Sequence, residues 1–116
     1  MKLEKGSIVL VPFDPSVGRE IKKIRPAVIF QNNLATKYSP FITLIPFSSK
    51  AYTGAIYQVP VLKDKENNLL EDSILLVNQI MTFDKVRIQA VLGKVNEEIL
   101  KQIQEKIDIH MGRKET

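Results

Sequence analysis

Arg25 and Ser48 are two side chains suited to binding a phosphate group, and both stand at the ends of apolar runs typical of β-strands. Arg25 precedes Pro26 and the run at 27–31, and Ser48 follows the run at 41–47. Adjacent antiparallel strands bring the start of one beside the end of the next, so the two side chains are predicted to meet at one end of the sheet. There they would offer a phosphate the paired donors of a guanidinium and the single donor of a hydroxyl.

A carboxylate, Glu20, lies close to this pair in the sequence, within Gly18-Arg19-Glu20. A carboxylate beside a bound phosphate is a candidate general base. The spacing is also typical of a simpler arrangement, in which Arg25 forms a surface ion pair with Glu20 and Ser48 only ends a strand. The spacing alone leaves both interpretations open.

The residue types exclude several other kinds of site. The chain has no cysteine, which rules out disulfides and thiolate metal sites, and its one histidine, His110, rules out a histidine pair within one chain. No metal-ligand spacing, glycine-rich phosphate loop or Gly-x-Ser-x-Gly motif is present. The carboxylates at 64–66 and 71–72 lie among turn residues and are interpreted as solvated. We therefore predict no metal ion and no other cofactor.

Positive charge is concentrated in the N-terminal half of the chain. The 116 residues include 17 Lys and Arg against 13 Asp and Glu, for a net charge of +4. Residues 1–60 contain eight basic and three acidic side chains. Four of the basic ones follow closely on one another, namely Arg19, Lys22, Lys23 and Arg25. Such a cluster attracts polyanions, although a solvated loop also tolerates it. Binding to a membrane surface is disfavoured, because no basic amphipathic helix accompanies the cluster.

The elements that must position these side chains are short β-strands. Apolar runs rich in β-branched residues and bounded by turn residues predict strands at 8–13, 27–31, 41–47, 55–62, 73–80 and 90–95. The run at 41–47 is apolar on both faces, as is typical of a central strand. Residues 14–24 form a long loop that carries most of the basic cluster, and residues 32–40 are predicted to be a turn region.

A single long helix is predicted at the C-terminal end. Asn96 is a good N-cap, Glu97 and Glu98 favour the first turn, and Gly112 is typical of the position just after a helix. The apolar stripe of this helix consists of Ile99, Leu100, Ile103, Ile107 and Met111. A short helical turn is also predicted at 82–85, with Thr82 or Asp84 as its cap. The fold class is therefore mainly β, a small, partly open antiparallel barrel of five to six or more strands with a C-terminal α-helix.

Length and hydropathy predict a single domain over residues 1–116. No apolar run approaches the roughly 20 residues of a membrane span. Residues 1–6 lack the apolar stretch of a signal peptide. We therefore expect a cytoplasmic protein.

Many segments of the chain occur in an order that is characteristic of one known family. These segments lie at residues 5–9, 13–15, 18–20, 25–29, 31–32, 45–48, 70–76, 78–87 and 92–93. In this ordered set the sequence resembles the MazF/PemK family of toxin endoribonucleases from bacterial toxin–antitoxin systems. The resemblance spans nearly the whole chain, from Lys5 to Ile109.

The resemblance implies roles for particular residues. The family's essential arginine falls on Arg25, its essential threonine on Ser48 and its loop glutamate on Glu20. Serine keeps the hydroxyl of threonine but loses the methyl group that restricts its rotamer, so we expect activity to survive. The strand at 73–80 is expected to contact bases. Ser73 and Gln79 are the candidates, because the two-residue period of a strand puts them on the same face as positions 75 and 77.

The resemblance also implies cleavage of single-stranded RNA without a metal. The simplest such reaction is attack of the RNA's own 2′-hydroxyl on the adjacent phosphorus, which leaves a cyclic phosphate and a free 5′-hydroxyl. Arg25 is predicted to stabilise the added negative charge, Ser48 to donate to a phosphate oxygen, and Glu20 to be the base. The flanking phosphates are predicted to be held by Arg19, Lys22 and Lys23.

Fold and partners follow from the same resemblance. Family members are SH3-like barrels related to the CcdB toxins, form homodimers and are neutralised by an antitoxin. The expected antitoxin is acidic and partly disordered, and folds on binding. The alternative is a non-catalytic SH3-like module that binds nucleic acid, or binds gyrase as CcdB does. A pure binding module would not need Arg25 and Ser48, whose presence therefore favours the ribonuclease.

Overall fold

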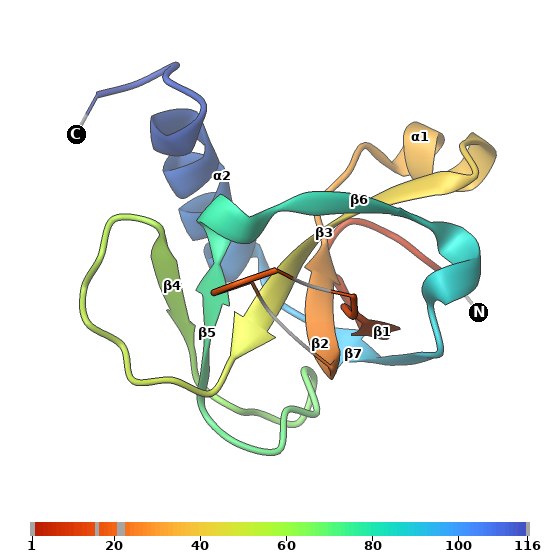
Figure 1. The fold of residues 1–116 in the computed structure, drawn as a ribbon, viewed down its shortest axis with the longest axis horizontal. Coiled ribbons are helices and arrows are strands. Elements are labelled where there is room, and N and C mark those ends of the chain that lie inside the picture. Colours follow the sequence, from red (N-terminus) through yellow and green to blue (C-terminus); the bar gives the residue numbers. More distant parts are fainter. Residues whose placement is uncertain (1, 16, 21–22, 116) are drawn as a thin grey trace.

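The computed structural model describes residues 2–15, 17–20 and 23–115, and in these ranges one curled antiparallel sheet dominates (Figure 1). The strands are β1 Ser7–Pro12, β2 Ile24–Ile29, β3 Phe41–Ser48, β4 Gln58–Val61, β5 Ser73–Leu76, β6 Met81–Asp84 and β7 Ala90–Lys94. The helical elements are α1 Asn33–Tyr38, α2 Glu97–His110 and the 3₁₀ turns η1 Val77–Gln79 and η2 Lys85–Arg87. The predicted class, mainly antiparallel β with a C-terminal helix, is confirmed.

Strand β3 organises the sheet, because three other strands pair with it. Its first half pairs with β6, its middle with β2 and its end with β5. The strand order is β4-β5-β3-β2-β1-β7, with β6 joined to β3 beside this path. The prediction that this apolar run is a central strand is confirmed. Because β3 is shared by partners at its two ends, the sheet curls around it (Figure 1).

Both faces of the sheet are covered, so neighbouring residues of one strand enter different cores. Ile8 and Val28 belong to the core beneath α2, whereas Val9 and Ala27 belong to a second core on the other face. This alternation follows from the two-residue period of a strand. It explains why the strands read as continuous apolar runs rather than as alternating polar and apolar residues.

Helix α2 begins and ends where the sequence predicts. The Asn96 side chain accepts a hydrogen bond from the Ile99 amide at 2.9 Å, and Gly112 has a φ of +76°. Ile103 is fully buried in the core beneath the helix, with the other predicted stripe residues partly buried around it. Met111 is the exception. It is 62% exposed because the helix ends at His110 and the chain turns away from the sheet there.

Three local predictions are wrong. Residues 32–40 contain α1, whose cap Asn32 accepts hydrogen bonds from two amides of the first turn. The predicted strand at 73–80 ends at Leu76, where η1 begins. The chain must turn there, because β5 pairs with the end of β3 and β6 pairs with its beginning. The predicted helical turn at 82–85 is mostly strand β6.

The two predicted cap residues of that turn, Thr82 and Asp84, have different roles. Asp84 caps η2 by accepting a hydrogen bond from the Val86 amide at 2.9 Å, as predicted for a cap, but Thr82 lies within β6 and pairs with Thr43.

The limits of two strands also differ from the predicted ones. The strand predicted at 27–31 spans 24–29, and the strand predicted at 55–62 spans only 58–61. A membrane-spanning helix is absent from the described residues, because none of their helices combines the required length with the required apolar character.

Candidate active site

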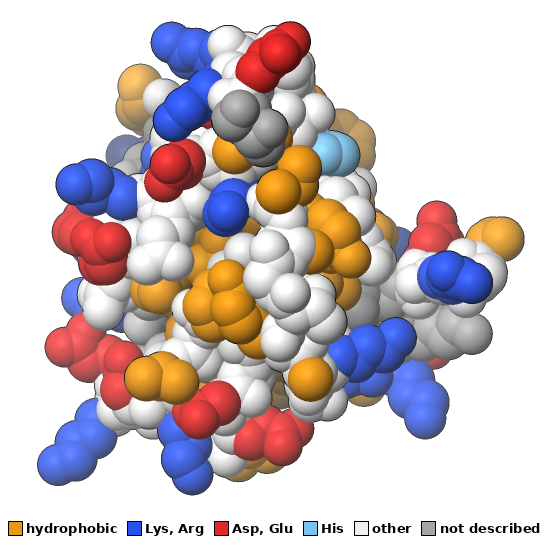
Figure 2. All heavy atoms as spheres, turned by 90° about the vertical axis from the view of Figure 1, so that its left-hand side faces the viewer, with side chains coloured by type: hydrophobic (Ala, Val, Ile, Leu, Met, Phe, Trp, Pro, Cys, Tyr) orange, Lys and Arg blue, Asp and Glu red, His pale blue; other side chains and the backbone are white. Residues whose placement is uncertain are grey.

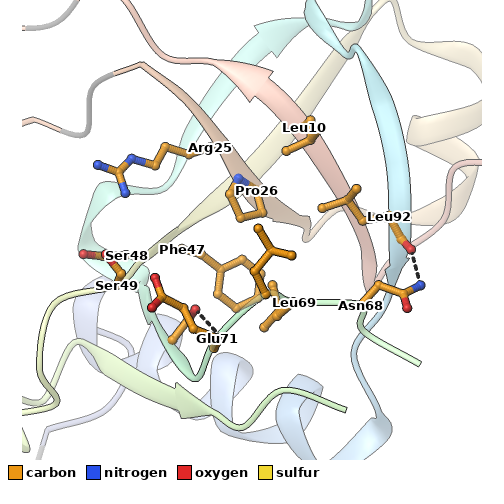
Figure 3. A pocket seen from close by; sticks show the side chains of 12 residues that line it. Leu10, Arg25, Pro26, Phe47, Ser48, Ser49, Asn68, Leu69, Glu71 and Leu92 are labelled. Atoms are coloured by element: carbon orange, nitrogen blue, oxygen red, sulfur yellow. Dashed lines mark hydrogen bonds between the residues drawn. The ribbon is translucent and has the colours of Figure 1, made fainter. Parts of the chain in front are cut away.

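A pocket of about 300 Å³ opens where β2, the end of β3 and the segment before β5 come together (Figure 3). We call it the Arg25 pocket. Arg25, Ser48 and Glu71 lie at one end of it, and its body is formed by apolar side chains such as Pro26 and Phe47. The pocket thus has a polar end suited to a phosphate and ribose and an apolar body suited to a flat, uncharged group.

Strand register explains why Arg25 and Ser48 meet. In the β2–β3 pair, Ala27 stands opposite Pro46. The same register continued by two residues sets Arg25 across from Ser48. On the other side of β3, Ser48 pairs with Ile74 of β5. The antiparallel pairing expected from the sequence therefore brings the guanidinium and the hydroxyl to one pocket.

Ser48 is held in a defined position. The residue is 4% exposed, and its hydroxyl oxygen accepts a hydrogen bond from the Lys50 amide at 3.2 Å. A hydroxyl has two lone pairs and one proton, so this bond leaves the proton available for donation. Arg25 is half-buried on β2, at the same end of the pocket (Figure 3). The two side chains can therefore donate together to one anionic group.

Glu20 does not line the Arg25 pocket. It lines a separate hollow together with Arg19 and Gln79, which we call the Glu20 hollow. The Glu20 carboxylate accepts a hydrogen bond from the Val17 amide at 2.6 Å and so closes a tight turn of its own loop. The structure therefore brings three predicted site residues together, but in a different hollow from Arg25 and Ser48.

The remaining basic residues of the loop are only partly described. Lys22 lies outside the described residues. Lys23 is exposed, has a φ of +66°, and its carbonyl accepts a hydrogen bond from the Phe13 amide at 2.8 Å. The base of the loop is held by Arg87, which donates to the carbonyls of Pro12 and Asp14 at 2.7 and 3.1 Å.

The prediction that Ser73 and Gln79 share one strand face is wrong. Because the strand ends at Leu76, only Ser73 remains on β5, and Gln79 lies in η1. The two positions between them on the supposed face, Leu75 and Val77, are fully buried in the core beneath α2. Ser73 lines the Arg25 pocket, and Gln79 lines the Glu20 hollow.

Glu71 is exposed, as the interpretation of residues 71–72 as solvated carboxylates predicts, but it also lines the Arg25 pocket, which that interpretation does not predict. The two acids differ in the structure. Asp72 accepts a hydrogen bond from the Lys63 amide at 2.9 Å, whereas Glu71 lines the Arg25 pocket. Nothing in the local sequence distinguishes the two acids, because both lie just before the predicted strand that begins at Ser73. Among the described residues, no group of three or more His, Cys, Asp or Glu side chains is arranged to hold a metal ion.

The segment that carries Glu71 is fixed by its own hydrogen bonds and by β7. The buried Asn67 side chain donates to the Leu62 carbonyl at 2.9 Å and accepts from the amides of Asp64 and Leu69, both at 3.0 Å. Asn68 donates to the Leu92 carbonyl at 2.7 Å (Figure 3). One wall of the Arg25 pocket is therefore a loop whose position depends on strand β7.

The curled sheet with a C-terminal helix is the fold of MazF-type toxins. MazF from Deinococcus radiodurans matches with a TM-score of 0.80 and 21% identity, over 95% of this chain and 96% of that one. A mycobacterial endoribonuclease, solved with its cognate antitoxin, also matches with a TM-score of 0.80, at 14% identity over 99% of this chain and 100% of that one.

Sequence comparison defines the family more narrowly. The model of the family described as PemK-like, MazF-like toxin of type II toxin-antitoxin system matches residues 4–111. The endoribonuclease MazF of Staphylococcus saprophyticus is 30% identical over 110 residues, which are 95% of this chain and 92% of that protein. The chain belongs to the PemK-like, MazF-like toxin family, as the resemblance predicted.

Proposed function

We propose that this toxin is a metal-independent endoribonuclease that cleaves single-stranded RNA, with the scissile phosphate held between Arg25 and Ser48. The observation that carries the proposal is the shared pocket of these two side chains. Membership of the family, and the name of the staphylococcal relative, support the same activity. A module that only bound nucleic acid would need the basic loop but not this pair.

The proposed reaction is attack of the 2′-hydroxyl on the adjacent phosphorus. Charge on the phosphate oxygens rises in the transition state, and the Arg25 guanidinium lies where it can stabilise that charge. The Ser48 hydroxyl donates to another phosphate oxygen. Glu20 as the base stays a prediction, and it requires the loop to carry this carboxylate from its own hollow to the Arg25 pocket.

The rest of the substrate would follow the basic loop. Arg19, Lys22 and Lys23 are proposed to hold flanking phosphates, which contributes affinity but no sequence preference. Ser73 in the Arg25 pocket and Gln79 in the Glu20 hollow are proposed to contact bases. Since these two sites are separate, the bases they contact would belong to different nucleotides.

The proposed partners are a second copy of the chain and an antitoxin, in the cytoplasm. The mycobacterial neighbour was solved with its cognate antitoxin. Exposed apolar side chains of the loop between β3 and β4, Tyr52, Ile56 and Tyr57, offer a surface for association. Figure 2 shows the face that carries this loop, where hydrophobic side chains gather near the centre and charged ones mostly around the edge. An acidic, partly disordered antitoxin would complement the basic loop.

The direct test is incubation of the purified, antitoxin-free protein with a long RNA in EDTA. Discrete products are expected, each pair ending in a cyclic phosphate and a 5′-hydroxyl, because the proposed chemistry needs no metal. End-group analysis and primer extension would identify the ends and the sites. Intact RNA in the presence of folded protein would refute the proposed activity.

Replacing Lys22 and Lys23 together by alanine is expected to weaken RNA binding at all sequences and to flatten its salt dependence. Each phosphate contact that is lost lowers the slope of log affinity against log salt by about 0.7 for a single strand. Fluorescence anisotropy of a 2′-O-methylated oligonucleotide, titrated at several salt concentrations, measures this slope. An unchanged slope would remove these two lysines from the RNA interface.

A further inference from the structure

The reaction needs a group that accepts the 2′-hydroxyl proton, and the loop glutamate lies in another hollow. We propose that Glu71 is this general base, an assignment that rests on the ribonuclease activity proposed above. It differs from the prediction made for Glu20, and the two can be separated by experiment.

The position of Glu71 relative to the phosphate-binding pair is the first argument. Ile74 of β5 pairs with Ser48 of β3, so the residues just before Ile74 reach the rim of the pocket at its polar end. Figure 3 shows the Glu71 side chain at the same end of the pocket as Ser48, with Arg25 across the opening. A phosphate held by Arg25 and Ser48 would therefore have the Glu71 carboxylate beside its ribose.

The backbone at Glu71 is held in place. The Ser73 hydroxyl donates to the Glu71 carbonyl at 2.9 Å, which fixes the turn into β5 (Figure 3). The preceding segment is held by Asn67 and Asn68, as described above. A base that must accept a proton from one defined atom benefits from such a rigid support.

The described residues that line the Arg25 pocket offer no other carboxylate or imidazole that could act as the base. Among the described residues that line the Arg25 pocket, Glu71 is the one acid, and none is a histidine. The neighbouring Asp72 carboxylate is bonded to the Lys63 amide, and the Glu20 carboxylate to the Val17 amide. His110 lies at the end of α2 and does not line the pocket.

The proton transfers balance with water as the only other reactant. As the 2′-oxygen forms its bond to phosphorus, its proton passes to the Glu71 carboxylate. The bond from phosphorus to the 5′-oxygen breaks, and the leaving oxygen takes a proton from water. Glu71 is exposed, so it returns its proton to the solvent without further help. The products are the 2′,3′-cyclic phosphate and the 5′-hydroxyl end.

The experiment compares Glu71→Gln with three other variants on one oligonucleotide that carries a site mapped with the unchanged protein. Glu71→Gln is expected to lower the single-turnover rate by about 10²–10⁴-fold, the contribution of a general base. It should also abolish the fall in rate toward acidic pH, which arises because protonation removes a carboxylate base. Affinity for the 2′-O-methylated oligonucleotide should change little, and circular dichroism should show the same fold.

The other variants serve as comparisons. Glu71→Asp keeps a carboxylate one methylene further away, so it should retain part of the rate and the acidic limb. Asp72→Asn removes one negative charge at the next position but keeps the acceptor for the Lys63 amide, and it should cleave like the unchanged protein. Glu20→Gln tests the rival assignment in the loop.

The outcomes distinguish Glu71 from Glu20 as the base and proton transfer from a role in positioning. Unchanged rate and unchanged acidic limb in Glu71→Gln would overturn the assignment, even if the unchanged protein cleaves RNA as proposed. Loss of the acidic limb in Glu20→Gln but not in Glu71→Gln would assign the base to the loop and also overturn it. A slower Glu71→Gln that keeps its acidic limb would also overturn the assignment, because it would show a role in positioning and not in proton transfer. If the unchanged protein left RNA intact, the proposed function itself would fail.

Discussion

Arg25→Ala is expected to lower the rate of RNA cleavage by about 10²–10³-fold, which is the typical cost of removing one donor to a developing anion. Arg25 and Ser48 line the same pocket and Arg25 is the one basic residue of β2, so no other side chain of that strand can replace the guanidinium at the phosphate. The fold should survive, because Arg25 is only half-buried and the strand residues that follow it form the core. Single-turnover cleavage in EDTA measures the effect.

Two further variants make the Arg25→Ala result specific. Arg25→Lys keeps the positive charge but not the planar fork of donors, so an intermediate rate is expected. Arg113→Ala removes an exposed arginine beyond the end of α2 and should cleave normally, which controls for the loss of one positive charge. Cleavage by Arg25→Ala at the same sites and rate would exclude the guanidinium from the reaction.

Gly93→Ala is expected to destabilise the protein by about 1–3 kcal/mol, the usual cost of forcing an extra group into packed structure. Gly93 lies in β7 opposite Ile8, and a Cβ there would overlap the Glu66 carbonyl oxygen and approach the backbone of Asn67. These are backbone atoms, so they cannot rotate away and the whole loop must move. Urea unfolding followed by circular dichroism gives the free energy of unfolding.

The same substitution should reduce cleavage even where the protein is folded. The displaced loop carries Leu69 and Glu71 to the Arg25 pocket, so its movement alters one wall of the site. Gly112→Ala is the matched control, because its Cβ would meet open space and only its φ of +76° is unfavourable. That variant should lose about 1–2 kcal/mol, the cost of the left-handed conformation for a residue with a Cβ, and should cleave normally. A fully active Gly93→Ala would show that the pocket does not depend on this contact.

Local sequence patterns were enough to predict much of this fold. A β-branched apolar run needs only its own composition to favour a strand, and α2 carries its limits in the cap Asn96 and the glycine at 112. The meeting of Arg25 and Ser48 was also predictable, because it follows from antiparallel pairing of strands that are neighbours along the chain.

Other features depend on contacts between distant parts of the chain. The break after Leu76 exists because β5 and β6 pair with opposite ends of β3, and no pattern within 73–80 records that requirement. The separation of Ser73 from Gln79 follows from the same break. Helix α1 has only six residues, too few for an apolar period to distinguish it from a turn.

The Arg25 pocket shows most clearly which features follow from the local sequence and which depend on the tertiary structure. Residue types and chain order indicated phosphate chemistry by an arginine and a hydroxyl, in a chain without cysteine and with one histidine. Which carboxylate stands beside them was decided by the β3–β5 pairing and by the packing of the loop against β7, which bring Glu71 to the rim. Glu20 is nearer to Arg25 in sequence, but its hydrogen bond to Val17 closes its loop over a different hollow. Closeness in sequence predicts local turns, whereas pairing between distant strands determines which of the two carboxylates lies beside Arg25 and Ser48.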